Sequence, residues 1–245
     1  MLKVKLNRFW MSREKKGISF YAILIFIFFG GLVMSGCMTS DKVMVTKGTR
    51  ISLIGNNLGA RMMHYGFFET EVQLKFPDHL LVIRNLCDGG NTPGFRPHSG
   101  RNEPWAFPGA SQFQNELAQN SGSQGHFETP DQWLDRLDTD LIISFFGFNE
   151  SFEDSAGLAL FIDELHAFIT HTRAQKYNGL HAPELVLVSP IAFQDLSKME
   201  DLPDGIEINR RLKMYTHAMA QVALEEKISF IDVFTPSTAW FSDKK

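Results

Sequence analysis

The 245-residue sequence contains only two cysteines, Cys37 and Cys87. Two cysteines cannot build a disulfide framework, and neither lies in the Cys-x-x-Cys or Cys-x-x-Cys-His patterns typical of zinc sites and c-type haem. Cysteine and histidine do not cluster elsewhere at zinc-ligand spacing. We therefore expect no metal site and no cofactor.

Positive charge is also scarce beyond the first 36 residues. Six of the 24 basic residues, but only one of the 28 acidic residues, lie in residues 1–36. The net charge is −4 for the whole chain and therefore −9 for residues 37–245. A body this acidic is a poor partner for nucleic acid or for an anionic bilayer surface.

Residues 1–36 have the pattern of a bacterial secretory signal peptide. A basic start precedes the uncharged stretch "ISFYAILIFIFFGGLVM" (18–34), and small residues precede Cys37 in "MSGC". This ending resembles a lipobox, whose cysteine is lipidated and becomes the mature N-terminus. The alternative is an uncleaved membrane anchor, because about 17 apolar residues is the lower limit for spanning a bilayer. Either interpretation exports the rest of the chain, and lipidation predicts a bacterial cell-envelope protein anchored at the outer membrane or periplasmic face.

Beyond a short tether (37–49), apolar segments alternate with amphipathic ones up to residue 245. The expected strands are 50–54, 80–86, 140–147, 184–190 and 228–234, and the clearest expected helices are 58–75, 155–176 and 208–222. Apolar strands separated by helices predict a three-layer α/β domain over residues 50–245, with a doubly wound, parallel five-stranded sheet of flavodoxin-like type. Ligands in such domains bind beyond the carboxyl ends of the strands.

The connection over residues 87–131 breaks this alternation, and it is rich in Gly, Pro, Ser and Asn. A loop this long inside a compact domain usually has a function or moves. It could form one wall of a cleft for a polar, carbohydrate-like ligand, or it could be a cap that packs on the sheet. Its aromatic and basic side chains are Arg96, His98, Arg101, Trp105, Phe107 and His126.

Polar residues follow the first three expected strands. They are "GNNL" (55–58), "RNLCDGGNT" (84–92) and "FGFNE" (146–150). In this order and at these positions they resemble the blocks of the SGNH, or GDSL, hydrolase family, which are Gly-Asp-Ser-Leu, a glycine, and Gly-x-Asn-Asp. The resemblance runs from about Arg50 to Phe234, and it implies an ester hydrolase fold with a small-molecule or carbohydrate ester as ligand.

The resemblance also implies roles for individual residues. Ester hydrolysis needs a nucleophile, a base, and donors for the developing oxyanion. The N–H of residue 57, the N–H of Gly90 and the amide of Asn149 match the family's oxyanion donors. We expect Gly55, Asn56, Asn91 and Glu150 to line the same pocket, with Glu150 supplying a charge that orients its loop.

The reacting groups themselves do not match. Asn57 stands where the family has its serine, and an amide is not a competent nucleophile. The Asp-x-x-His block expected after the fifth strand does not occur, and we expect the closing helix to be missing with it. The string Asp163 to His166 falls inside an amphipathic helix and is rejected as the catalytic pair. Cys87, Ser144 and Ser189 are interpreted as structural.

Three interpretations stay open at this point. The chain is a hydrolase-like domain with impaired catalysis, a non-catalytic module that binds a glycan or another polar ligand, or the N-terminal piece of a larger envelope protein. Asn57 moves the prediction away from catalysis and towards binding or loss of activity.

Overall fold

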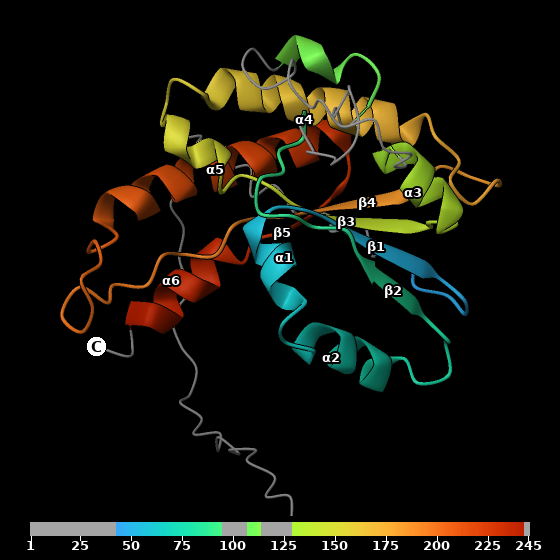
Figure 1. Cartoon of the computed structure of the whole chain (residues 1–245), viewed down its shortest axis with the longest axis horizontal. Helices are drawn as coiled ribbons and strands as arrows, with labels where there is room; N and C mark the ends of the chain where they lie inside the picture. Colours follow the sequence, from blue (N-terminus) through green and yellow to red (C-terminus); the bar gives the residue numbers. More distant parts are fainter. Residues whose placement is uncertain (1–42, 95–106, 114–128, 243–245) are drawn as a thin grey trace, which may run out of the picture. The chain divides into compact units, whose positions relative to one another are not determined.

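An all-parallel, five-stranded sheet forms the centre of the domain in the computed structural model (Figure 1), which describes residues 43–94, 107–113 and 129–242. The strands are β1 (Arg50–Gly55), β2 (Val82–Asn85), β3 (Leu141–Phe145), β4 (Glu184–Val188) and β5 (Ser229–Ile231). Their order across the sheet is β2-β1-β3-β4-β5. The order reverses at β1, so the loops after β1, β2 and β3 lie next to one another, where ligands bind in such sheets.

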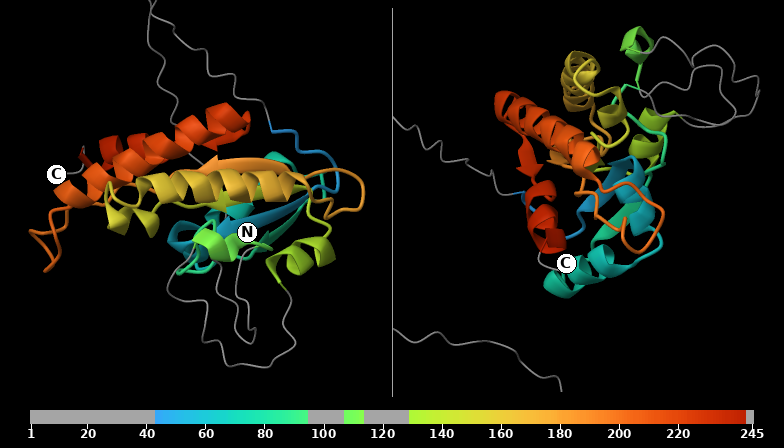
Figure 2. Two further views of the ribbon diagram at one scale, coloured as in Figure 1. Left: turned by 90° about the horizontal axis from the view of Figure 1, so that it is seen from above. Right: turned by 90° about the vertical axis from the view of Figure 1, so that its left-hand side faces the viewer.

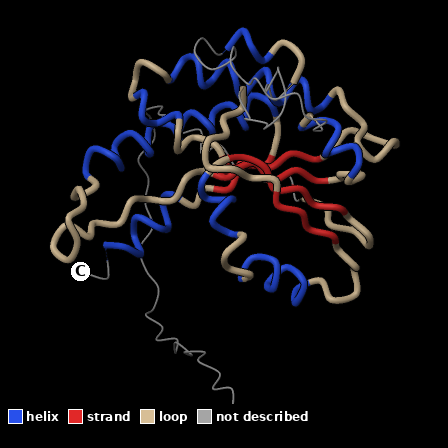
Figure 3. The backbone as a smooth tube through the Cα atoms, in the orientation of Figure 1, coloured by secondary structure: helices blue, strands red, loops and turns tan. Residues whose placement is uncertain are grey.

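Helices cover both faces of the sheet, as Figures 1 and 2 show. The helices are α1 (Asn57–Met62), α2 (Phe67–Lys75), α3 (Pro130–Arg136), α4 (Leu158–Arg173), α5 (Ile206–Glu226) and α6 (Phe234–Ser242), with short 3-10 turns η1 (Ala110–Phe113) and η2 (Glu150–Glu153). Helices α3, α4 and α5 lie on one face, and α1, α2 and α6 lie on the other. The tube in Figure 3 shows the strands enclosed between these two layers. The predicted three-layer fold is therefore confirmed.

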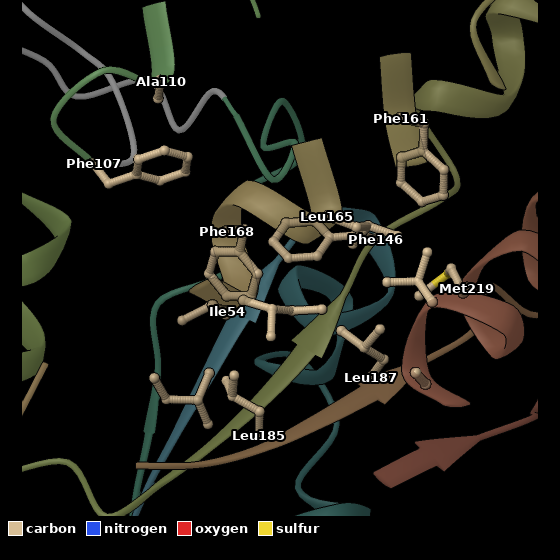
Figure 4. Packing of buried hydrophobic residues seen from close by; sticks show 14 of the residues in the cluster. Ile54, Phe107, Ala110, Phe146, Phe161, Leu165, Phe168, Leu185, Leu187 and Met219 are labelled. Atoms are coloured by element: carbon tan, nitrogen blue, oxygen red, sulfur yellow. The ribbon is translucent and has the colours of Figure 1, made fainter. Parts of the chain in front are cut away.

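The larger core fills the space between the sheet and helices α4 and α5. Phe161, Leu165 and Phe168 recur along α4 at the spacing of one helix face, and all three are buried. They pack against Ile54 and Phe146 from the strand ends, as Figure 4 shows. The apolar stripe expected in the 155–176 segment thus attaches α4 to the sheet.

A second core lies on the other face of the sheet. Leu53 and Phe145 from the strands and Cys87 after β2 are buried there. Helices α1 and α2 contribute partly buried residues, and so does the segment ahead of β1 through Val43 and Val45. Helix α2 has no buried residue, so this layer is thinner than the opposite one.

Two expected elements differ from the structure. The segment 58–75 is not one helix, because α1 ends at Met62 and α2 begins only after Gly66. Helix α6 does follow β5, so the expectation that a closing helix is missing was wrong. Asp232 accepts hydrogen bonds from the Thr235 N–H (2.9 Å) and hydroxyl (2.6 Å), which stabilises the start of α6.

The predicted signal peptide lies outside the described residues. Within the described residues, no helix combines the length and the apolar character needed to cross a membrane.

Gly59 brings α1 close to Cys87, two residues after β2. A Cβ at this position would lie 2.2 Å from Cys87 Sγ and 2.8 Å from Phe145 Cδ2. We expect Gly59→Ala to destabilise the domain by about 1–3 kcal/mol in chemical denaturation, because overpacking forces neighbouring atoms to move. Cys87→Ala in the same chain should recover part of this loss. Gly66→Ala is the control, because its Cβ would meet nothing closer than Thr70 Oγ1 at 3.8 Å; equal losses for the two alanine variants would contradict the packing.

Candidate functional site

The turn after β1 requires glycine. Gly55 has a φ of 114°, and a Cβ there would lie 2.2 Å from the carbonyl oxygen of Phe145 in β3. The next residue, Asn56, donates its backbone N–H to that same carbonyl over 2.8 Å. Strands β1 and β3 therefore end in direct contact, and the chain enters α1 at Asn57.

Asn149 connects the loops that follow β2 and β3. Its side-chain NH₂ donates to the carbonyl of Gly89 (2.8 Å) and to that of Asn91 (3.2 Å). Its carbonyl oxygen accepts a long hydrogen bond, 3.5 Å, from the side-chain NH₂ of Asn57. Two carbonyl acceptors determine which side of the amide carries the nitrogen, so the orientation of Asn149 is fixed by its partners.

The side chain of Asn57 lies between the loops that follow β2 and β3. Its Oδ1 lies 2.9 Å from the point where a Cβ on Gly89 would stand, and its Nδ2 lies against Asn149. The amide is thus held between the β2 and β3 loops. It contacts both loops and can hydrogen-bond, but it cannot attack a carbonyl carbon.

The three expected oxyanion donors differ in availability. The backbone N–H groups of Asn57 and Gly90 donate to no described residue, and Gly90 is exposed. Both hydrogens of the Asn149 amide, in contrast, already have carbonyl acceptors. Of the three expected donors, only Asn149 would have to give up a hydrogen bond to receive an incoming oxygen atom.

Asn91 is buried beneath these loops. Its side-chain NH₂ donates to the carbonyl of Gly55 over 3.1 Å, which fixes the β2 loop to the end of β1. Among the described residues its Oδ1 has no hydrogen-bond partner. Asn91 therefore supports these loops from within and is not exposed at their surface, as a residue lining a binding site would be.

Glu150 is a buried carboxyl group that joins the β1 and β3 loops. Its Oε2 accepts from the Gly147 N–H (2.8 Å) and from the Asn56 side-chain NH₂ (3.4 Å), while Oε1 has no partner among the described residues. Burial raises the pKa of Glu150 to about 8, against the lowering effect of backbone N–H donors, and the carboxylate of Glu164 raises it further. The group is mainly neutral at pH 7. The expectation that Glu150 orients its loop through a charge is therefore corrected. The neutral carboxyl orients the loop through its hydrogen bonds to Gly147 and Asn56.

Several predicted residues fall where the structure gives no account. Arg96, Trp105 and Cys37 lie outside the described residues, and so do His98, Arg101 and His126. Phe107, from the same long connection, is buried and stacks on His171 with the ring centroids 4.9 Å apart. Of the two alternatives for the long connection, a cleft wall or a cap packed on the domain, Phe107 follows the second.

The residues that were rejected as catalytic have partners or packing within the fold. His166 lies on α4 with its Nδ1 2.7 Å from Glu226, so the string beginning at Asp163 is not a catalytic pair. The Ser189 hydroxyl accepts from the N–H groups of Val233 and Phe234 at the start of α6. Cys87 is buried, as expected.

Two features of the site were not anticipated from the sequence. Gly89 contacts both Asn57 and Asn149, whereas the family pattern pointed to Gly90 alone. The hydrogen bond between Asn56 and Glu150 explains why polar side chains are buried after β1 and β3. In the sequence, amide and carboxyl residues recur shortly after these strands, and this recurrence indicates a polar site. It does not indicate which of these side chains hydrogen-bond to each other.

The described residues contain no group of three or more His, Cys, Asp and Glu side chains that could hold a metal ion. A cavity of about 320 Å³ lies at the amino ends of the strands, on the opposite edge of the sheet from the site. Its lining includes Lys47, Asp140, His181 and Glu184. It shares no residue with the strand-end loops that carry the resemblance.

The elements described above define a class of fold, a three-layer α/β domain around a parallel five-stranded sheet. No protein-family model matches the sequence, and no curated protein matches it significantly. Solved structures do match in fold. A catalytic mutant of Axe2, an acetylxylan esterase from Geobacillus stearothermophilus, has a TM-score of 0.50 at 12% identity, with 81% of this chain and 82% of that chain covered.

Two further structures share the fold. The acetyl xylan esterase AlAXEase has a TM-score of 0.50 at 13% identity, covering 80% of this chain and 82% of its own. A gut microbial diltiazem-metabolizing enzyme has a TM-score of 0.53 at 12% identity over 79% of this chain. The present chain spans only 38% of the length of that enzyme. At these identities the likeness establishes the fold alone.

The raised pKa of Glu150 predicts how stability depends on pH. Between the ordinary value of 4.5 and about 8 the folded state keeps a proton that the unfolded state releases. The free energy of unfolding should therefore fall as pH rises through this window, by on the order of 4 kcal/mol, and level off above it. Glu150→Gln should remove this slope in urea denaturation curves measured from pH 5 to 9. Glu153→Gln, on the exposed part of the same turn, should keep it; an unchanged slope in Glu150→Gln would show that another group titrates.

Proposed function

We propose that this domain binds an O-acylated carbohydrate, or a similar polar ester, without hydrolysing it. The observation that carries the proposal is the position of Asn57. By the family resemblance Asn57 stands where a nucleophile is expected; its side chain contacts Asn149, while the backbone N–H groups of Asn57 and Gly90 have no described acceptor. The site thus has donors for a carbonyl oxygen and lacks the group that would attack the carbonyl carbon.

No described histidine hydrogen-bonds the side chain of Asn57. His166 and His171, both on α4, hydrogen-bond Glu226 and Asp131 through a ring nitrogen. His181 lies just ahead of β4, with its ring near Asn178, and therefore at the amino edge of the sheet. We therefore expect a hydroxyl restored at position 57 to find no partner among these three histidines to take its proton.

The chemistry of the pocket favours an acyl group on a sugar. An acetyl carbonyl oxygen can accept from a backbone N–H such as that of Asn57 or Gly90, and the side-chain amide of Asn57 suits a sugar hydroxyl. The fold likeness to two acetylxylan esterases supports the same ligand class. An ester that enters this pocket would be oriented and retained, and its C–O bond would stay intact.

The leader pattern supports a place in the cell envelope. The lipobox-like "MSGC" would attach residues 37–245 to a membrane through a lipid on Cys37. The segment that leads into β1 reaches the amino edge of the sheet, and the candidate site lies at the carboxyl edge. An anchor on Cys37 would therefore join the domain at the edge away from its ligand site.

We expect no ester hydrolysis from the chain or from Asn57→Ser. With p-nitrophenyl acetate, both should release p-nitrophenol at the rate seen with Asn57→Ala, because a serine without a base is a weak nucleophile. Near-native melting temperatures would show that the variants fold. Rapid turnover by Asn57→Ser alone would contradict the absence of a base, and turnover by the unmodified chain would contradict the proposal.

Cys37→Ser tests the anchor. In a bacterial host, the unmodified chain should fractionate with membranes and incorporate radiolabelled palmitate, and the variant should lose the label. Cys87→Ser is the matched control, because it changes the buried thiol of the domain and leaves the lipobox intact. Equal labelling of the two variants, or no labelling of the unmodified chain, would contradict lipidation at Cys37.

A further inference from the structure

The cavity at the amino ends of the strands is formed where three separate segments meet. Its volume is about 320 Å³. The segment ahead of β1 supplies one wall, and the starts of β3 and β4 supply the other. Figure 1 shows the segment ahead of β1, coloured blue, at this edge of the sheet and away from α1. The cavity is therefore separate from the strand-end loops.

The wall ahead of β1 is a tight turn over residues 46–49. The Thr49 hydroxyl donates to the carbonyl of Thr46 (2.9 Å) and accepts from the Thr46 N–H (3.0 Å). Gly48 has a φ of 86° and donates its N–H to the segment ahead of β2. The turn thus holds the backbone of Lys47, whose side chain is exposed and makes no ion pair with a described residue.

The opposite wall carries two carboxylates. Asp140 accepts from the Arg50 N–H (2.8 Å) through one oxygen and from the Asn178 side-chain NH₂ (2.7 Å) through the other, so its position is fixed. Glu184, the first residue of β4, accepts the Met44 N–H through Oε2 over 3.3 Å. No described residue hydrogen-bonds its Oε1. Glu184 therefore has an oxygen available to a ligand, and Asp140 adds negative potential beside it.

The remaining polar group of the cavity is already engaged. The ring nitrogens of His181 lie 3.0 Å from the Ala182 carbonyl oxygen and 3.0 Å from the Asn178 side-chain nitrogen. The described residues provide no group of His, Cys, Asp and Glu side chains that could hold a metal ion, so the carboxylates are not part of a metal site. The cavity is thus lined by one ammonium group and two carboxylates, and Lys47 pairs with neither of them.

We infer that this cavity is a second binding site, which takes a small zwitterion with a free α-ammonium and a free α-carboxylate, such as a dipeptide. The ligand's ammonium group would donate to Glu184, and its carboxylate would accept from Lys47. The volume is at the lower end of the range for small-molecule sites, which suits a ligand of this size. The inference does not depend on the proposed function, because the two sites share no residue.

Ligands with a single sign of charge fit this lining less well. A phosphate or another anion would approach Lys47 but would also meet the carboxylates of Asp140 and Glu184. A simple amine would pair with the carboxylates and leave Lys47 without a partner. A zwitterion satisfies both signs at once, and this match determines the ligand class.

The test compares three probes by calorimetric titration of the full chain, purified in detergent. The probes are L-alanyl-L-alanine, its N-acetyl derivative and its C-terminal amide. Acetylation removes the ammonium charge and amidation removes the carboxylate, while the peptide stays close to its original size. The free dipeptide should bind at least about tenfold more tightly than either derivative, because each derivative loses a charge-assisted hydrogen bond.

Two variants assign the charges to their partners. Lys47→Gln should lower the affinity for the dipeptide about tenfold and leave the affinity for the amide unchanged. Glu184→Gln should lower the affinity for the dipeptide similarly and leave that for the N-acetyl derivative unchanged. Both residues are exposed, so melting temperatures should stay near that of the unmodified chain. Lys198→Gln is the matched control, because Lys198 is exposed in the loop after β4, which follows the carboxyl edge of the sheet.

Saturable binding of the dipeptide that is weakened in both cavity variants and kept in Lys198→Gln would support the site. No binding of the dipeptide, or equal binding of all three probes, would overturn it. Equal losses in Lys47→Gln and Lys198→Gln would also overturn it, because the loss would then follow from net charge and not from the cavity.

Discussion

The arrangement of the site depends on the hydrogen bonds of the Asn149 side-chain amide. It joins the carbonyls of Gly89 and Asn91 in the β2 loop to the β3 loop, and its own oxygen faces Asn57 at the end of β1. Three loops far apart in the sequence are thereby held within hydrogen-bond distance. The parallel sheet brings the strand ends together, and this one amide fixes the loops against each other.

The same interaction limits the chemistry. An amide whose two hydrogens are held by carbonyls stabilises the loops but is not free to stabilise an oxyanion. Below it, the neutral Glu150 carboxyl connects Gly147 and Asn56. The site is a hydrogen-bonded framework in which the backbone N–H groups of Asn57 and Gly90 have no acceptor among the described residues, which agrees with the proposed binding of a polar group.

The sequence was sufficient for the fold and partly sufficient for the site. Continuous apolar segments such as β3 identify buried strands, and the 3.6-residue period of Phe161, Leu165 and Phe168 identifies α4, because burial imposes these patterns directly. The break after Met62 was missed because several apolar residues continue through Gly66. Helix α6 was missed because its start depends on the hydrogen bonds of Asp232, which apolar periodicity does not report.

For the site, position was predictable and partnership was not. That Asn57, Asn149 and Glu150 lie at one edge of the sheet followed from their places shortly after strands whose ends meet there. The protonation of Glu150 depends on burial and on Glu164 from α4, and the choice of Gly89 depends on loop geometry. The protonation state of Glu150 and the contacts of Gly89 with Asn57 and Asn149 cannot be predicted from one stretch of sequence, since contacts between distant segments determine them.

The most direct measurement is calorimetric titration of the full chain with acetylated and with chemically deacetylated xylobiose, followed by NMR of the recovered ligand. Retention of the acetyl group with preferential binding of the acetylated form would agree with a pocket that binds esters and does not cleave them. Equal binding of the two forms, or release of acetate at a rate that depends on protein concentration, would contradict it.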